Sequence, residues 1–257
     1  NQLIEAALWL ENGVIHAIGE SFDEADFEQV FDANGQLITP GLVDVHVHFR
    51  EPGFTYKETI KTGSKAAARG GFTTVCAMPN LNPVPDTAEK LSEVYDLIQK
   101  DAVVKVLQYA PITEELRSEV LTNQKALKEA GAFAFTNDGV GVQTAGTMYL
   151  AMKEAAALNM ALVAHTEDES LLFGGVMHEG EVSKKLGLPG ILSATEASQI
   201  ARDITLAKET GVHYHVCHVS TEESVRVIRD AKKAGIHVTA EVSPHPVSYT
   251  HLRAHET

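Results

Sequence analysis

Two histidines stand two residues apart in the apolar segment that runs from Asp44 to Arg50. Alternate residues of a strand face the same side, so His46 and His48 are expected to point the same way. Burying these polar groups together on a strand of Val and Phe is costly unless something pairs them, and a metal ion does so through the imidazole nitrogens. The spacing alone leaves a hydrogen-bonded polar core open as the alternative.

Polar residues also stand at the C-terminal ends of later apolar segments that have the composition of strands. In a parallel barrel such strand ends gather at one mouth, which is where these folds keep their active sites. The residues are therefore expected to converge on the histidine pair, and this convergence favours the metal site. They are Asn80, Asp138, His165 and His218.

Four histidines and one carboxylate are more donors than the three or four that one zinc ion takes. A two-metal site with Asp138 as the bridge accommodates them, with the ions ~3.5–4 Å apart and a hydroxide shared between them. Because the metals lower the pKa of water, such a hydroxide is a nucleophile near neutral pH. The chemistry expected of the site is hydrolysis or its reverse.

The elements that must position these residues follow a repeating pattern of apolar, β-rich runs and helical stretches. This alternation predicts an α/β fold with a parallel sheet buried on both sides, either a (β/α)₈ barrel or a doubly wound sheet. Periodicity does not separate the two. The seven expected strands are Leu42–Phe49, Thr73–Met78, Val103–Leu107, Ala132–Phe135, Ala161–Ala164, Tyr214–Cys217 and His237–Val242.

A different pattern precedes Pro40 and Gly41. From Ala6 to Leu37, short apolar runs are broken by Asn-Gly pairs, which is typical of small antiparallel strands and hairpins. A domain boundary near residue 40 is therefore predicted, which separates residues 1–40 from the domain at residues 41–245 that carries the histidines.

Residue patterns that mark the start of a helix lie between the expected strands. The segment from Ser220 to Glu223 has the pattern of a capping box, and Ser193 with Glu196 has another. Each pair is expected to start a helix that leads back to the next strand.

Composition excludes several classes of protein. Of 257 residues 44% are hydrophobic, and 21 Lys and Arg face 35 Asp and Glu, which argues against nucleic acid as a partner. No apolar run approaches the ~18–20 residues of a membrane span, and the first ten residues lack the features of a signal peptide. Cys76 and Cys217 are too few for a disulfide framework and are expected to pack within strands. A cytoplasmic protein with no membrane partner is predicted.

Longer motifs make the chain similar to a known group. It resembles the cyclic amidohydrolase superfamily and, more narrowly, the bacterial class I dihydroorotases, over about Asn12 to His245. Besides the histidine strand, the motifs that carry the resemblance are Phe49 to Gly53, Met78-Pro79-Asn80, Asn137 to Gly141, His178-Glu179-Gly180 and Val216 to Ser220.

The resemblance implies a fold and a ligand set. The fold would be a TIM-type (β/α)₈ barrel at residues 41–245, here incomplete with seven strands. Residues 1–40 would be a partial β-sandwich, which the family builds from both chain ends. Two Zn²⁺ ions would be held, one by His46 and His48 and the other by His165 and His218, with Asp138 bridging them.

The resemblance also implies a substrate and its binding residues. The reaction would be the reversible interconversion of L-dihydroorotate and N-carbamoyl-L-aspartate, a step of pyrimidine biosynthesis. Arg50 and Asn80 would hold the substrate carboxylate, and His48 would contact the substrate as well as a metal. A planar guanidinium matches a carboxylate through two parallel hydrogen bonds, so an acidic substrate suits this residue type.

Two groups of relatives are the alternatives. Dihydropyrimidinases and hydantoinases share the histidine strand but bridge their metals with a carboxylated lysine, where this chain has Asn137 and Asp138; allantoinases tend to lack an arginine at the position of Arg50. Some dihydroorotase-like proteins are non-catalytic partners of aspartate carbamoyltransferase, but those usually lose metal ligands. A homodimer or a complex with that transferase is the expected assembly.

The chain departs from the family pattern at its ends. The family uses an aspartate of the eighth strand to move a proton to the leaving nitrogen, and no eighth strand is found after His245. Residues 246–257 are expected to be a non-native tail, and the first residue is expected to lie inside the sandwich. The polypeptide alone is therefore expected to be unstable and of negligible activity.

Overall fold

The computed structural model describes residues 3–243, so the tail expected at residues 246–257 lies outside the described part. The chain divides into two compact units, Asn1–Gly41 and Leu42–Thr257. No helix within residues 3–243 is both long enough and apolar enough to cross a bilayer.

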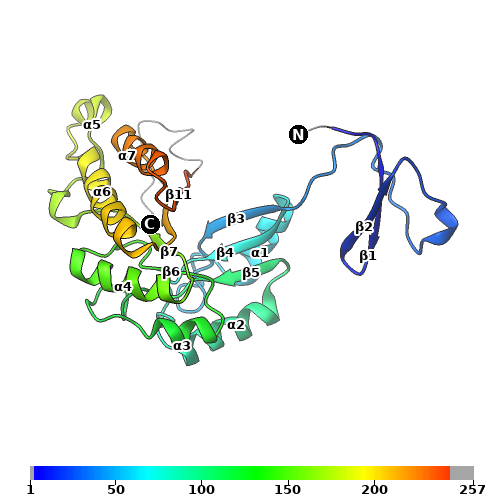
Figure 1. The fold of residues 1–257 in the computed structure, drawn as a ribbon, viewed down its shortest axis with the longest axis horizontal. Helices are drawn as coiled ribbons and strands as arrows, with labels where there is room; N and C mark the ends of the chain where they lie inside the picture. Colours follow the sequence, from blue (N-terminus) through cyan, green and yellow to red (C-terminus); the bar gives the residue numbers. More distant parts are fainter. Residues whose placement is uncertain (1–2, 244–257) are drawn as a thin grey trace. The chain divides into compact units, whose positions relative to one another are not determined.

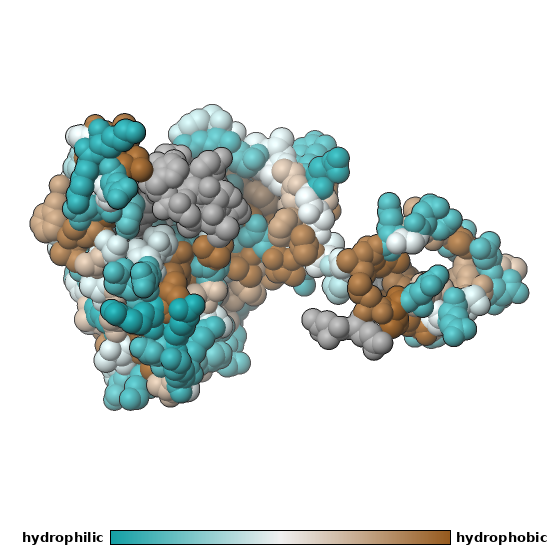
Figure 2. Space-filling view, turned by 90° about the horizontal axis from the view of Figure 1, so that it is seen from above, coloured by the Kyte–Doolittle hydropathy of each residue, from teal (hydrophilic) through white to brown (hydrophobic). Residues whose placement is uncertain are grey.

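In the described residues of the Asn1–Gly41 unit, β1 (Ala7–Glu11) and β2 (Val14–Gly19) form an antiparallel hairpin, which is followed by the short helix η1 (Glu24–Asp26). Asn12 and Gly13 connect the strands with φ angles of 51° and 79°, because a two-residue turn of this hand needs both residues in the left-handed region. Figure 2 shows extensive apolar surface on this unit. The β-sandwich predicted here stays a prediction.

Seven parallel strands form the sheet of the Leu42–Thr257 unit within the described residues (Figure 1). Three of them pair in the order β3-β4-β5 and four in the order β6-β7-β10-β11, and a parallel bridge between Ala110 and Phe135 connects the two groups. The strands are β3 (Leu42–Val47), β4 (Phe72–Ala77), β5 (Lys105–Gln108), β6 (Phe135–Thr136), β7 (Leu162–Ala164), β10 (Tyr214–Val216) and β11 (Val238–Ala240).

This alternation of parallel strands and helices confirms the α/β prediction. In residues 3–243, β3 and β11 are not paired with each other, so closure into a complete barrel stays a prediction. A small parallel ribbon, β8 (Met177–His178) with β9 (Gly190–Ile191), lies in the glycine-containing segment between β7 and α6.

Most of the helices begin where a side chain accepts a hydrogen bond from an unpaired backbone N–H. Their bounds are α1 (Ile60–Arg69), α2 (Ala88–Asp101), α3 (Gln124–Glu129), α4 (Ala145–Ala157), η2 (Glu169–Leu171), α5 (Glu181–Leu186), α6 (Ser193–Thr210) and α7 (Glu222–Lys233). Side chains that cap the N-termini of α1, α2, α3, α4 and α7 in this way belong to Thr59, Thr87, Asn123, Thr144 and Thr221.

Both predicted capping boxes need correction. The cap of α7 is Thr221, whose hydroxyl accepts from Ser224 N, so the pattern is shifted by one residue from Ser220. Helix α6 begins after Leu192, which offers no side-chain cap. Glu196 lies 2% exposed and accepts hydrogen bonds from the backbone N–H and hydroxyl of Ser220 instead.

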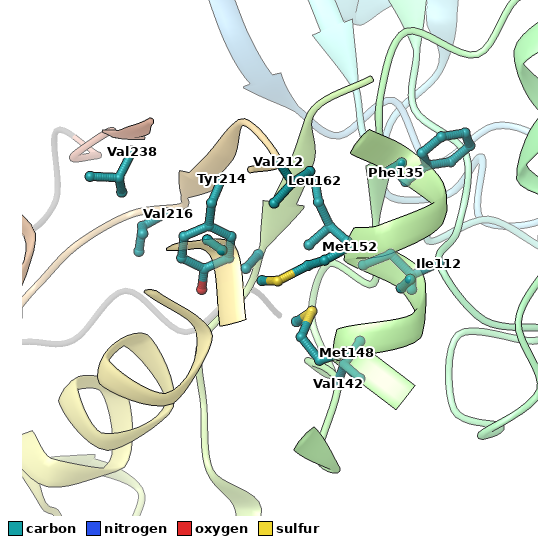
Figure 3. Packing of buried hydrophobic residues seen from close by; sticks show 14 of the residues in the cluster. Ile112, Phe135, Val142, Met148, Met152, Leu162, Val212, Tyr214, Val216 and Val238 are labelled. Carbon is teal, nitrogen blue, oxygen red and sulfur yellow. The ribbon is translucent and has the colours of Figure 1, made fainter. Parts of the chain in front are cut away.

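The main hydrophobic core packs helices α2, α3, α4, α6 and α7 against the strands. Figure 3 labels Met152, Leu162 and Tyr214 among its residues. Leu162, Tyr214 and Val216 contribute one face of their strands to it. Their neighbours along the same strands, Val163 and Cys217, pack in a separate cluster on the opposite face, as strand alternation requires. The sheet is therefore buried on both sides.

Candidate metal centre

Strand β3 delivers the first two imidazoles. Its pairing with β4 is irregular between Asp44 and Val47, and His46 N donates to Asp44 Oδ1 at 3.0 Å. Asp44 therefore closes a local bend of the strand. His46 lies within this irregular segment and His48 directly follows the strand. His46 Nε2 lies 3.3 Å from His48 Nε2, so the two rings do meet as the spacing predicts.

Asp138 lies at the centre of the four histidines. Its side chain is fully buried, and the strand β6 ends two residues before it. Asp138 Oδ1 lies 3.5 Å from His46 Nε2, 3.7 Å from His165 Nδ1 and 3.9 Å from His218 Nε2. Asp138 Oδ2 lies 3.6 Å from His48 Nε2. The structure thus brings together all five predicted metal ligands.

His165 and His218 form the second imidazole pair. They follow β7 and β10, and His165 Nδ1 lies 3.0 Å from His218 Nε2. Gly141 packs against the loop of His165 so closely that a Cβ would stand 2.8 Å from His165 O, and its φ is 61°. His218 has a φ of 33°, an uncommon angle for a residue with a side chain, which favours a functional constraint on its position.

Asn80, predicted to bind substrate, contacts the ligands instead. Its Oδ1 accepts from His48 Nδ1 at 2.9 Å, and its Nδ2 donates to Asp138 Oδ2 at 3.0 Å. Both ends of the amide are therefore engaged with the metal-ligating residues. The contact with His48 Nδ1 places the lone pair of that ring on Nε2, which faces Asp138.

Arg50 follows β3 with a φ of 58° and is half-buried. Within residues 3–243, its guanidinium has no hydrogen bond to another side chain and no ion pair. Such a cation, two residues from His48, is available to an anionic ligand.

Glu241 also contacts the histidine cluster, and it was not among the residues predicted from the sequence. It directly follows β11, and its Oε1 lies 2.6 Å from His46 Nδ1 while its Oε2 lies 3.3 Å from His215 Nε2. Burial acts to raise the pKa of Glu241, but the hydrogen bonds from His215 and His46 outweigh it and lower the pKa to about 2. A polar residue at a C-terminal strand end was the available signal, the same one that identified Asn80 and Asp138.

Cys217 lies beside the histidines and Asp138, but its protonated thiol does not resemble a metal ligand. Its sulfur belongs with His46 and Asp138 to a group of possible ligand atoms that all lie within 4.8 Å of one another. Burial raises the pKa of the Cys217 thiol to about 12, so the thiol keeps its proton. Cys76 and Cys217 are both buried in the hydrophobic cluster that also contains Val163.

The residues present fit a metal ion. Asp138 Oδ1 is buried and has no hydrogen-bond partner within residues 3–243, which is costly for a carboxylate unless a cation joins it. Burial opposes ionisation of Asp138, but His165, His218 and His46 hold its pKa well below the usual value. Imidazole nitrogens around a carboxylate oxygen are the donor set of a zinc site. The cluster at the strand ends is therefore a candidate metal centre.

A parallel α/β sheet with four histidines and an aspartate at its C-terminal strand ends defines the class of metal-dependent amidohydrolases. The family model described as dihydro-orotase-like matches residues 35–224. The chain belongs to this dihydro-orotase-like family.

The relatives support the same assignment. A dihydroorotase of Ligilactobacillus salivarius is 63% identical over 95% of this chain, and one of Listeria monocytogenes is 61% identical over 92%. The chain spans about half the length of these curated relatives, 57% and 55%. Among solved structures, the L-hydantoinase (dihydropyrimidinase) of Arthrobacter aurescens matches with a TM-score of 0.80 and 25% identity, over 95% of this chain and 55% of that one.

Proposed function

We propose that the chain carries the metal centre of a zinc-dependent dihydroorotase, which interconverts L-dihydroorotate and N-carbamoyl-L-aspartate. The observation that carries the proposal is the buried Asp138 Oδ1, which lies between two imidazole pairs and has no hydrogen-bond partner within residues 3–243, in a chain 63% identical to a dihydroorotase. We assign one zinc ion to His46 and His48 and a second to His165 and His218, with Asp138 between them. The short contacts within each pair, 3.3 Å and 3.0 Å, support this division.

The residues have separate tasks in this reaction. Zinc at such a site supplies Lewis-acid polarisation of a carbonyl and a water of lowered pKa. Arg50 binds the substrate carboxylate and thereby orients the ring toward the histidines, since a guanidinium holds a carboxylate in a fixed plane. Asn80 orients His48 and Asp138 through hydrogen bonds at the two ends of its amide. The contribution of Asn80 and His48 to substrate binding stays a prediction.

We further propose that the 257-residue chain by itself has negligible activity. The resemblance assigns proton transfer to the leaving nitrogen to an aspartate of an eighth strand. We assign this proton transfer to none of the residues gathered at the metal centre. The cytoplasmic location, the homodimer and the complex with aspartate carbamoyltransferase also stay predictions.

The test separates this function from that of a hydantoinase. The zinc-loaded chain is titrated calorimetrically with the two acids, carbamoyl-L-aspartate and dihydroorotate. The same titration is made with dihydrouracil and hydantoin, two ring compounds that lack the carboxylate. Turnover of the ring compounds is followed in parallel. Selective binding of the two acids supports the proposal. Preference for the neutral rings favours the hydantoinase alternative, and a chain that takes up no zinc contradicts both.

A further inference from the structure

We propose that Glu241 is a positioning residue for His46. Its carboxylate fixes the tautomer and the ring orientation of this ligand from the Nδ1 side of the imidazole. The inference rests on the proposed metal centre and adds a residue to its support. Glu241 follows the last described strand, β11, and lies 195 residues from His46 in the sequence.

The contact between the two side chains is short and sheltered. Glu241 Oε1 lies 2.6 Å from His46 Nδ1, and the side chains are 16% and 10% exposed. An ionised carboxylate only accepts hydrogen bonds, so the proton of His46 is on Nδ1 and the lone pair is on Nε2. Nε2 is the atom that faces His48 and Asp138. A carboxylate behind a ligating imidazole fixes its orientation and raises its basicity as a ligand.

Other contacts hold Glu241 itself in place. Its Oε2 lies 3.3 Å from His215 Nε2, and the Nδ1 atom of His215 lies 2.8 Å from Thr239 Oγ1. The backbone N–H of His218 also donates to Glu241 Oε1, at 3.3 Å. Both carboxylate oxygens are therefore engaged behind the ligands.

The backbone of Glu241 adds to this anchoring. Glu241 N donates to Val216 O at 3.0 Å, and Glu241 O accepts from Val219 N at 2.9 Å. The residue is thus tied to both sides of the turn that carries His218. A side chain held at so many points is suited to orient a neighbour and has little freedom to enter the site as a ligand.

The experiment measures zinc affinity of the 257-residue chain by competition with a chromophoric chelator. Glu241→Gln is expected to weaken zinc binding by about 10- to 100-fold, the range found for residues behind metal ligands. Glu223→Gln removes the same charge from an exposed position of α7 and is the matched control, expected to leave the affinity unchanged. Cobalt(II) absorption spectra of both variants report changes in coordination directly.

A second background distinguishes positioning from general structural support. In a His46→Asn chain the ligand that Glu241 serves is gone, so Glu241→Gln is expected to cost no further zinc affinity. Equal losses in both backgrounds, or an unchanged affinity of the single variant, overturn the inference. A wild-type chain that binds no zinc contradicts the proposed function itself, whereas wild-type binding with no effect of the variant contradicts only the role of Glu241.

Circular dichroism establishes whether each variant folds. If Glu241→Gln does not, His215→Phe takes its place, since this change removes a hydrogen-bond partner of the carboxylate while leaving Glu241 present. Weakened zinc binding by folded His215→Phe supports the inference, and wild-type affinity contradicts it.

Discussion

Asn80 Nδ2 lies 3.0 Å from Asp138 Oδ2, while the other end of the same amide accepts a hydrogen bond from His48. One uncharged side chain thus connects a carboxylate and an imidazole that both face the centre of the candidate metal site. This geometry assigns Asn80 to the support of the ligands, whatever it contributes to substrate binding.

Asn80→Ala is expected to lower the zinc affinity of the chain by about 10- to 100-fold, because His48 and Asp138 both lose an orienting partner. Chelator competition measures it. Asn159→Gly is the control, since Asn159 precedes β7, at the opposite end from His165, and its φ of 53° suits glycine. An affinity equal to wild type, accompanied by weaker binding of carbamoyl-L-aspartate, would show that Asn80 serves only the substrate.

Zinc is expected to stabilise the fold. At a free concentration about 100 times the Kd, a ligand that binds only the native state adds roughly 2.7 kcal/mol to the free energy of unfolding. For a chain of this size that corresponds to an increase in Tm of about 5–10 °C, measured by thermal unfolding with and without zinc. Magnesium, which prefers oxygen ligands, is the control ion. Equal shifts with both ions contradict a histidine-based site.

Much of the centre could be predicted from sequence because one physical rule applies to several strands. Parallel strands place their C-terminal ends at one edge, so polar residues that end apolar strands meet there. This rule identified Asp138, His165 and His218, and the structure brings them together with His46 and His48. The same rule applies to Glu241, which directly follows the observed strand β11. The sequence did not single it out, because the predicted strand ran one residue further, to Val242.

Partners of individual side chains could not be predicted, because they depend on distances between segments far apart in sequence. Asn80 bonds to Asp138 across 58 residues, and nothing local indicates that its amide faces ligands and not solvent. Glu196 gives a second case. Its spacing from Ser193 matches a capping box, yet its carboxylate accepts a hydrogen bond from Ser220, 24 residues away.

Arg50→Lys is expected to weaken binding of carbamoyl-L-aspartate to the zinc-loaded chain by about 10- to 100-fold. Lysine keeps the charge but loses the two parallel hydrogen bonds, and hydrogen bonds to charged groups contribute roughly 1.5–3 kcal/mol. Calorimetric titration measures the change. Arg69→Lys, at an exposed position of α1, is the matched control. If the two variants bind the acid equally well, Arg50 does not contact its carboxylate.

Asp203 is expected to make the stability of the chain depend on pH. This carboxyl is fully buried in α6, accepts from Tyr214 at 2.9 Å and lies 2.7 Å from Arg202. Burial is the larger influence and raises the pKa of Asp203 from 3.8 to about 6, although Arg202 acts to lower it. The folded chain therefore binds this proton more tightly than the unfolded chain does.

The direction of the effect follows from that difference. Below about pH 4 both states are protonated, and the stabilisation by the proton is complete; it is lost as the pH rises through about 6. Two pKa units correspond to roughly 3 kcal/mol, an upper value because Arg202 is partly exposed to solvent. Asp203→Asn lacks this titration, so its stability relative to wild type should improve by up to that amount between pH 4 and pH 7.

Urea unfolding of both chains across this pH range measures the difference, and subtraction removes the contributions of groups that titrate alike in both. Asp230→Asn on α7 is the control, since Asp230 is exposed and pairs only with Lys233 within residues 3–243. A difference that stays constant with pH would mean that folding leaves the pKa of Asp203 unchanged. A difference that moves in favour of wild type would mean that Arg202 outweighs burial and holds Asp203 ionised.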